Sequence, residues 1–213
     1  MQSYQQDFLQ LALDREVLKF GEFQLKSGRI SPYFFNLGLI SDGAGMTTTA
    51  NCYADALLTE NITFDMLFGP AYKGIPLVTA VAMALAAKGR NIPYAYNRKE
   101  AKDHGEGGRL VGAALSGKVV IVDDVMTAGT AVREAISMVQ AAGAEVAGVL
   151  IALDRQERAN DQTTQSAVQL LSNEGIPVYS IVGLDQVIEH LNNQDTAATA
   201  LTAIQQYRQQ YGV

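Results

Sequence analysis

The chain has 213 residues, enough for one ordinary domain with its own hydrophobic core and short for two. Its 16 Lys and Arg residues against 22 Asp and Glu residues give a net charge of −6, which disfavours an extended basic surface for nucleic acid. One Cys and two His exclude a disulfide framework and a Cys/His-rich zinc site, and this cysteine usage fits a reducing, cytoplasmic setting.

The N-terminal part of the chain predicts a helix followed by a small hood. Apolar residues at helical spacing predict a helix over about 4–19, which Gly21 would end. Alternating residues over 23–29 and the aromatic run 33–36 predict two short strands around a Ser-Gly turn. We expect these strands to form a hood outside the main sheet.

From residue 47 onward, helical stretches alternate with short apolar runs, a pattern typical of a parallel sheet flanked by helices. The apolar runs, expected as strands, are 64–68, 93–96, 119–122, 146–153 and 178–182. The expected helices cover about 47–60, 75–88, 130–142 and 164–173, with one or two more between 184 and 211. Residues 98–117 are charged and rich in glycine, and they predict no helix. The sequence therefore predicts a single α/β domain with a mostly parallel central sheet.

Nothing in the sequence predicts contact with a membrane. The first residues lack the positive charge of a secretory signal. No stretch approaches the roughly 20 apolar residues that a membrane-spanning helix needs. We therefore expect a protein of the cytoplasm.

Polar or flexible residues follow four of the expected strands. In open α/β sheets, ligands bind beyond the carboxyl ends of the strands, so these segments are expected on one edge. Any single polar loop would mean little, because most loops are polar. Together the four supply glycines, cations and a carboxylate pair, which suits a phosphorylated substrate that carries hydroxyls. The segments are 69–74, 97–99, 123–124 and 154–155.

The most specific segment is Val-Val-Ile-Val-Asp-Asp-Val-Met-Thr-Ala-Gly-Thr at 119–130. Free N–H groups and the dipole at a helix N-terminus favour a phosphate, and adjacent carboxylates such as Asp123 and Asp124 can accept hydrogen bonds from the vicinal hydroxyls of a ribose. The turn lacks the Gly-Lys-Ser/Thr ending of a nucleotide P-loop, and no Gly-x-Gly-x-x-Gly follows a strand. Simple helix capping remains an alternative, although it would need only one of the two carboxylates.

These motifs resemble those of the type I phosphoribosyltransferases and, among them, the orotate phosphoribosyltransferases. The segment 119–130 resembles the family's signature for phosphoribosyl pyrophosphate (PRPP), and the resemblance covers essentially the whole chain. The further segments that carry it are 20–36, 68–76 and 97–108. The resemblance implies one phosphoribosyltransferase domain over 1–213, with an N-terminal helix and hood over about 1–40 and a mobile catalytic loop over about 97–109.

The resemblance implies transfer of the 5-phosphoribosyl group from PRPP to orotate, giving orotidine 5-phosphate and pyrophosphate in de novo pyrimidine (UMP) biosynthesis. Mg²⁺ would be held mainly through substrate oxygens, without a dedicated protein metal site. Catalysis would consist of positioning and of electrostatic stabilisation of an oxocarbenium-like transition state. The resemblance further implies a homodimer in which the catalytic loop reaches the neighbouring subunit's site.

The resemblance also assigns residues to each role. The implied catalytic residues are Lys73, Arg98, Lys102, His104 and Asp124. The implied PRPP contacts are Lys26, Tyr72, Lys73, Arg98, Lys99, Lys102, His104, Asp123, Asp124, Val125, Met126, Thr127, Ala128, Gly129, Thr130 and Ala131. The implied orotate contacts are Phe34, Phe35, Thr127 and Arg155.

Simpler interpretations of several of these residues stay open. Phe34 and Phe35 alternate sides of their strand, so one can line the base site while the other joins the core, and plain core packing would explain both. Arg155 can bind a carboxylate bidentately, or form a surface ion pair with Asp154 or Glu157.

Two loops have their own implied roles. The segment 71–74 resembles the family's pyrophosphate loop, in which a non-proline cis peptide bond is common, and Lys73 would neutralise the departing pyrophosphate. In the segment 98–109, glycines permit hinge motion and cations suit a polyphosphate. Its acidic residues nearly balance the cations, so without the resemblance a solvated loop is an equal alternative.

Two rival functions use the same fold. A phosphoribosyltransferase for purines or another base would share the PRPP site, but the motifs of the N-terminal hood favour orotate. A regulator that senses PRPP while it binds nucleic acid is disfavoured by the net charge of −6. The length also disfavours a second catalytic barrel such as a fused decarboxylase would need.

Overall fold

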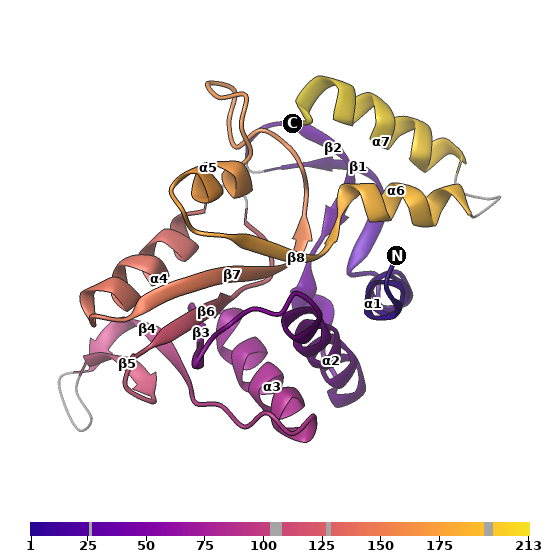
Figure 1. Ribbon diagram of the computed structural model, residues 1–213. Coiled ribbons are helices and arrows are strands. Elements are labelled where there is room, and N and C mark those ends of the chain that lie inside the picture. The colour runs from indigo at the N-terminus through magenta and orange to yellow at the C-terminus, as the bar shows by residue number, and fades with distance from the viewer. Residues whose placement is uncertain (26, 103–107, 127–128, 194–197) are drawn as a thin grey trace.

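A six-stranded sheet forms the centre of the structure, a computed structural model that describes residues 1–25, 27–102, 108–126, 129–193 and 198–213 (Figure 1). The strands are β3 (Met66–Gly69), β4 (Tyr94–Lys102), β5 (Gly108–Gly112), β6 (Lys118–Val122), β7 (Glu145–Asp154) and β8 (Val178–Gly183). They lie in the order β5-β4-β3-β6-β7-β8, and all neighbours are parallel except β4 and β5. The predicted mostly parallel α/β sheet is therefore confirmed.

Helices cover both faces of this sheet (Figure 1). They are α1 (Ser3–Asp14), α2 (Gly43–Thr59), α3 (Gly74–Ala87), α4 (Thr130–Ala141), α5 (Ala167–Asn173), α6 (Leu184–Asn192) and α7 (Ala198–Tyr211). The first three pack on one face, and α4 and α5 pack on the other. None of these described helices is long and apolar enough to cross a bilayer.

Alternate residues of the central strands face opposite layers of helices. In β6, Val120 and Val122 pack in the apolar cluster with α1 to α3, whereas Val119 and Ile121 pack in the cluster with α4 and α5. Successive side chains of a strand point to opposite faces, and here both faces are buried. This explains why the run 119–122 is apolar at every position.

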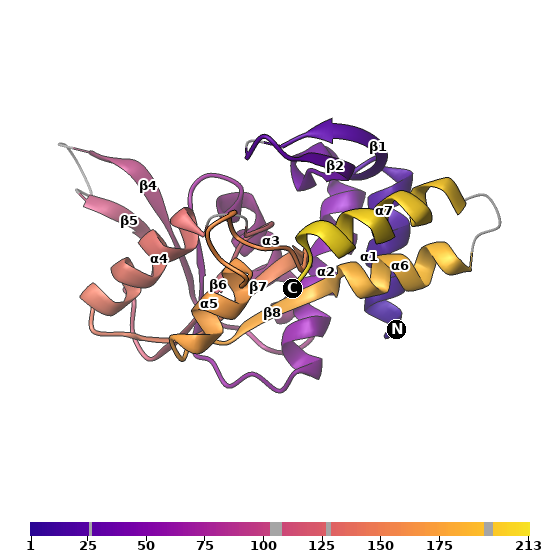
Figure 2. The ribbon, with the colours of Figure 1, turned by 90° about the horizontal axis from the view of Figure 1, so that it is seen from above.

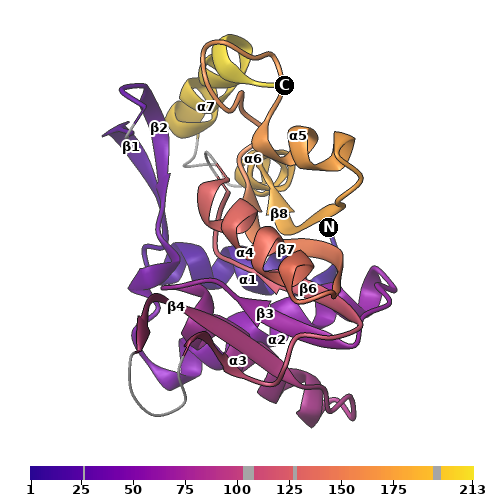
Figure 3. The ribbon, with the colours of Figure 1, turned by 90° about the vertical axis from the view of Figure 1, so that its left-hand side faces the viewer.

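An antiparallel hairpin of β1 (Leu18–Gln24) and β2 (Ile30–Phe35) lies outside the main sheet. Figures 2 and 3 show this hairpin beside α7, away from the central strands. Ser31 and Tyr33 of β2 are fully buried, so one side of the hairpin is anchored to the rest of the molecule. The hood predicted from the sequence is confirmed as a separate element.

The predicted end of the first helix is wrong. The helix ends at Asp14 rather than near Lys19, because Glu16 adopts a positive φ of 55° that a helix does not accommodate. Gly21 does not end this helix, since it lies inside β1. The apolar residues after the break belong to the alternating pattern of the hairpin.

One predicted strand ends earlier than expected, and the stretch for which no helix was predicted forms strands. The strand expected over 23–29 ends at Gln24, and the chain then turns, with the Gly28 backbone N–H donating to the Leu25 carbonyl at 2.9 Å. Within 98–117, where no helix was expected, β4 continues to Lys102 and pairs with β5. The remaining elements agree with the prediction within a few residues.

Candidate active site

The carboxyl ends of β3, β4, β6 and β7 lie at one edge of the sheet. These strands are neighbours and run parallel, so the residues that follow them are brought together. The four polar segments predicted for this edge therefore converge. In particular, the turn after β3 faces the carboxylate pair after β6.

The turn from β3 into α3 brings the backbone of Gly69 close to that of Gly74. A Cβ at Gly69 would lie 2.2 Å from the Gly74 carbonyl oxygen, so only glycine fits there. The Ala71–Tyr72 peptide bond is cis, as the resemblance implied. The Ala71 N–H donates to the Oδ1 of buried Asn97 at 2.9 Å, which ties this turn to β4. Sequence reasoning missed Asn97 as a support, since its role depends on the pairing of β3 with β4.

Lys73 joins this turn to the carboxylates after β6. Its Nζ lies 2.6 Å from Asp124 Oδ2 and 3.3 Å from Asn36 Oδ1. The Lys73 side chain is 49% exposed, whereas that of Asp124 is 9% exposed. Two of the predicted catalytic residues are thus in direct contact, and Asn36, which sequence reasoning did not single out, connects them to the end of the hairpin.

Asp123 is buried beside Asp124. Burial, with the charge of Asp124, raises the pKa of Asp123 to about 7. Its Oδ1 accepts a hydrogen bond from the Asp124 N–H at 2.9 Å. Its carbonyl accepts another at 2.8 Å from the hydroxyl of Tyr53, a fully buried residue of α2. The backbone that carries both carboxylates is therefore held by the helix layer, through a tyrosine that sequence reasoning missed.

The N-terminus of α4 follows the carboxylates closely. Gly129 is the residue before the helix and has a φ of 72°, a left-handed conformation that favours glycine. Thr130 and Ala131 form the first turn, where backbone N–H groups have no partner within the helix. This arrangement suits a phosphate. Val125 pairs with β7 through an isolated bridge and Met126 is buried, so both lead the chain from the sheet to this helix.

A cavity of about 550 Å³ lies between the hairpin and the chain segments after β6 and β7. Phe34 and Phe35 line it from the hairpin, and Arg155 lines it from the end of β7. Phe35 is buried, and its ring centroid is 6.3 Å from that of Phe8, whereas Phe34 is 39% exposed. Phe35 therefore joins the core, as predicted for one of the two rings, and the contact of Phe34 with the base stays a prediction.

Arg155 is buried, and contacts on several sides fix its guanidinium. Nε donates to Glu157 Oε1 at 2.8 Å, and Nη2 donates to Ser31 Oγ at 3.1 Å. Its Cζ lies 4.3 Å from the centroid of the Tyr33 ring. Of the partners weighed from the sequence, Glu157 is the correct one, but the idea of a surface pair is wrong, because Arg155 is only 7% exposed.

Other predicted residues lie on β4 or outside the described residues. Arg98 and Lys99 belong to β4, and the Lys99 ammonium lies 5.1 Å from the ring centroid of Tyr72, whose side chain is 67% exposed. Lys102 is in β4, but its side chain is not described. The predictions that fall outside the described residues concern Lys26, His104, Thr127 and Ala128.

The oxygen donors of the site suit a hard cation. The carboxylates of Asp123 and Asp124 are the ligand type that Mg²⁺ prefers. Across the part of the chain that the structure describes, His, Cys, Asp and Glu side chains form no group of three or more that could hold a metal ion. These two carboxylates are the described residues of this edge that would hold a Mg²⁺ ion, together with oxygens of water or of a bound substrate.

Comparison with known proteins gives consistent matches. The family model of the phosphoribosyl transferase domain matches residues 46–178. Orotate phosphoribosyltransferase of Marinobacter nauticus is 55% identical over 100% of both chains, and that of Chromobacterium violaceum is 56% identical over 100% of this chain and 99% of its own. The crystal structure of orotate phosphoribosyltransferase from Francisella tularensis has a TM-score of 0.87 and 44% identity, covering 97% of this chain and 99% of that chain.

Proposed function

Because the chain belongs to the orotate phosphoribosyltransferases of the phosphoribosyl transferase family, we propose that PRPP and orotate react at the carboxyl edge of its sheet. The enzyme transfers the 5-phosphoribosyl group of PRPP to orotate, a step of pyrimidine biosynthesis. The observation that carries the placement is the contact of Lys73 with Asp124, between the turn after β3 and the start of α4.

PRPP spans three neighbouring parts of this edge. The 5-phosphate binds at the first turn of α4, within the run from Val125 to Ala131. The ribose hydroxyls donate to Asp123 and Asp124. The pyrophosphate faces the turn that carries Tyr72 and Lys73, with Arg98 and Lys99 on the adjacent strand β4. The strand order supports this placement. Strands β4 and β3, which carry the residues for the pyrophosphate, lie next to β6, which carries the carboxylates for the ribose.

Orotate occupies the cavity of about 550 Å³ that Phe34, Phe35 and Arg155 line. The Nη1 nitrogen of Arg155 is used by neither Glu157 nor Ser31, so it is the donor for the orotate carboxylate. The exposed ring of Phe34 supplies an apolar surface for the planar base, and Phe35 forms the wall behind it. Thr127 and Lys26, which the resemblance assigns to substrate contacts, stay predictions.

The reaction breaks the bond from the anomeric carbon to pyrophosphate and forms the bond from that carbon to a ring nitrogen of orotate, whose proton passes to the departing pyrophosphate or to solvent. Positive charge grows on the sugar and negative charge on the leaving pyrophosphate. Lys73 stabilises the leaving group, and Asp124 faces the sugar. Mg²⁺, held mainly through substrate oxygens near Asp123 and Asp124, would supply further positive charge for the pyrophosphate.

The catalytic loop and the dimer complete this proposal. We assign Lys102 and His104 to the pyrophosphate as catalytic residues of the loop over about 97–109, acting in the neighbouring subunit of a homodimer. The support is the resemblance to the family, together with the position of β4 and β5 as the two outermost strands on one side of the sheet. A cytoplasmic setting, expected from the single cysteine, stays a prediction.

A panel of bases tests the function. The protein is mixed with Mg²⁺, PRPP and one base at a time, and pyrophosphate release is measured together with the ultraviolet absorbance of the base. We expect release with orotate and none with hypoxanthine or adenine. Release with a purine but not with orotate would contradict the proposal.

A further inference from the structure

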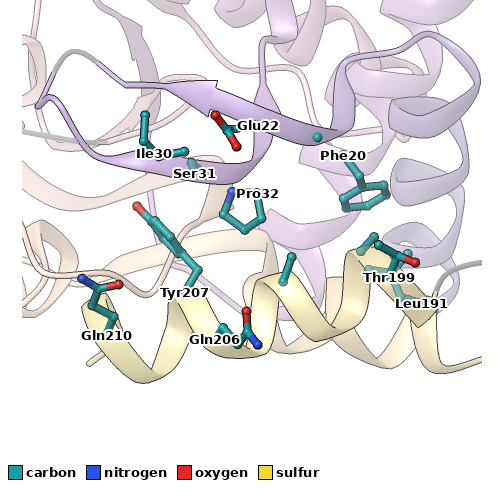
Figure 4. A pocket seen from close by; sticks show the side chains of 13 residues that line it. Phe20, Glu22, Ile30, Ser31, Pro32, Leu191, Thr199, Gln206, Tyr207 and Gln210 are labelled. Atoms are coloured by element: carbon teal, nitrogen blue, oxygen red, sulfur yellow. The ribbon is translucent and has the colours of Figure 1, made fainter.

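The C-terminal helix α7 lies against the hairpin and carries a tyrosine that no step above has used. Residues of the hairpin and of α7 line a cavity of about 760 Å³, and Figure 4 shows Tyr207 rising from the helix toward Ser31. Tyr207 itself is only 6% exposed. Its ring meets that of Tyr33 edge-on, with centroids 6.3 Å apart at 81°. Tyr207 therefore reaches the tyrosine on which the Arg155 guanidinium lies.

The hydroxyl of Tyr207 contacts the acidic partner of Arg155. It donates to Glu157 Oε2 at 2.7 Å. The same carboxylate accepts from Arg155 Nε at 2.8 Å and from Arg155 Nη2 at 3.3 Å. The side chains of Arg155 and Glu157 are 8% and 14% exposed, so water competes little with these contacts. A continuous chain of hydrogen bonds therefore runs from α7 to the guanidinium.

The end of the chain also fixes the backbone that carries Glu157. Glu157 and Gly212 form an isolated antiparallel bridge. The Arg158 N–H donates to the Tyr211 carbonyl at 2.9 Å, and the Val213 N–H donates to the Gln156 carbonyl at 3.1 Å. Helix α7 and the two residues after it thus contact both the backbone around Glu157 and its side chain.

We propose that Tyr207 is a positioning residue for orotate binding. It holds Glu157 in the orientation that grips Arg155 along its Nε and Nη2 edge, which leaves Nη1 directed to the orotate carboxylate. The inference rests on the proposed function, in which Arg155 binds that carboxylate. An arginine has many rotamers, so a guanidinium that is already fixed loses less entropy when the ligand arrives.

The test is Tyr207→Phe, which removes the hydroxyl and keeps the ring. Loss of a hydrogen bond to a charged group weakens the hold on Glu157, so we expect the KM for orotate to rise about tenfold. The KM for PRPP and kcat should stay within about twofold, because the PRPP contacts do not involve α7. Tyr211→Phe is the matched control. Its ring is 4.9 Å from that of Tyr207, but its hydroxyl accepts from Gln210 rather than contacting Glu157, so its orotate KM should not change.

A double-mutant cycle tests the route through Glu157. In a Glu157→Gln background, Tyr207→Phe should raise the orotate KM far less than it does in the wild type, because Tyr207 acts through the carboxylate. Equal effects in both backgrounds would overturn the inference. So would an unchanged orotate KM in Tyr207→Phe, or an equal rise in both KM values, which would indicate a general structural role. If the wild-type protein itself does not consume orotate, the proposed function fails instead.

Discussion

Lys73 has different partners in the free protein and in the proposed reaction. Without substrate its ammonium neutralises Asp124 at 2.6 Å. In the proposed reaction the ribose hydroxyls bind Asp124 and the pyrophosphate binds Lys73, so the proposal requires this ion pair to separate when PRPP binds. The lysine side chain is 49% exposed and has room to move. At the scale of single residues, Lys73 and Asp124 therefore neutralise each other in the free protein, and the proposed substrate contacts would replace this ion pair.

The substitution Lys73→Met tests this role. Loss of one group that stabilises developing charge lowers turnover by about 10²–10³-fold, so we expect kcat to fall by that order. Steady-state kinetics with saturating PRPP measure the effect. Lys88→Met is the control, because Lys88 pairs with Asp55 on the surface at 2.8 Å, away from the site. Turnover of Lys73→Met equal to that of Lys88→Met would remove Lys73 from the mechanism.

The buried charge of Asp123 is expected to lower the stability of the fold while it serves substrate binding. Its pKa in the fold is about 7 against an ordinary value of 3.8, so between these pH values the folded protein binds more protons than the unfolded chain. The stability that the protonated carboxyl contributes is therefore lost as the pH rises toward 7. Asp123→Asn keeps the Oδ1 acceptor without the charge. At pH 8 we expect its Tm to rise by about 2–4 °C, the effect of about 1 kcal/mol, with loss of PRPP turnover.

Thermal unfolding at two pH values checks this prediction. At pH 5 the wild-type carboxyl is mostly protonated, so the two proteins should have similar Tm values. A variant that melts at or below the wild-type temperature at pH 8 would show that Asp123 is not a destabilising charge.

The sequence predicted which residue types the site would hold, but not which supports fix them. Lys73, Asp124 and Arg155 were predicted, because each follows a strand or belongs to a motif. Tyr207 was not, since its partner Glu157 lies 50 positions away in the chain and only the packing of α7 brings them together. The same reason hid Tyr53, which reaches Asp123 from α2.

At the scale of elements, the turn from β3 into α3 determines where Lys73 points. The turn is tight because the backbones of Gly69 and Gly74 are in contact, which leaves no room for a Cβ on Gly69. The sequence predicted a turn there, and its glycines agree with that prediction. The end of the first helix was predicted wrongly because the sequence gives no comparable signal there. Nothing in its apolar spacing signals that Glu16 leaves helical geometry and that the hairpin begins at Leu18.

Gly69→Ala tests the turn. The new Cβ would lie 2.2 Å from the Gly74 carbonyl, so the backbone must shift, and we expect a loss of about 1–3 kcal/mol in the free energy of unfolding. PRPP binding should weaken as well, because Lys73 moves with the turn. Denaturant unfolding and PRPP titration measure the two effects. Gly43→Ala is the control, since a Cβ there meets nothing within 4 Å; equal behaviour of the two variants would contradict this account.

At the scale of the molecule, the net charge of −6 conceals a group of cations at one edge of the sheet. The carboxyl ends of adjacent strands bring Lys73, Arg98, Lys99 and Arg155 to one side of the sheet, where Lys73 pairs with Asp124 and Arg155 with Glu157. The overall charge therefore argues against a long polyanion such as nucleic acid. It does not argue against a small phosphorylated substrate bound at one site.

The proposed sharing of the active site between subunits predicts complementation between two inactive variants. Lys102→Ala removes a proposed catalytic group of the loop, and Asp124→Ala removes a carboxylate of the same site. If the loop acts in the neighbouring subunit, a mixture of the two inactive variants should regain activity, up to about a quarter of the wild-type turnover when subunits exchange at random. Activity is measured after exchange has been confirmed by mass spectrometry. No recovery in exchanged dimers would contradict a site shared between subunits.

A crystal structure of the protein with orotidine 5-phosphate would show directly where the substrates lie. We expect the phosphate at the first turn of α4, beside Gly129 and Thr130, and the ribose hydroxyls at Asp123 and Asp124. The carboxylate of the base should lie on Nη1 of Arg155. A nucleotide bound in the cavity between the hairpin and α7, or a phosphate away from α4, would contradict the assignment of the active site to the carboxyl edge of the sheet.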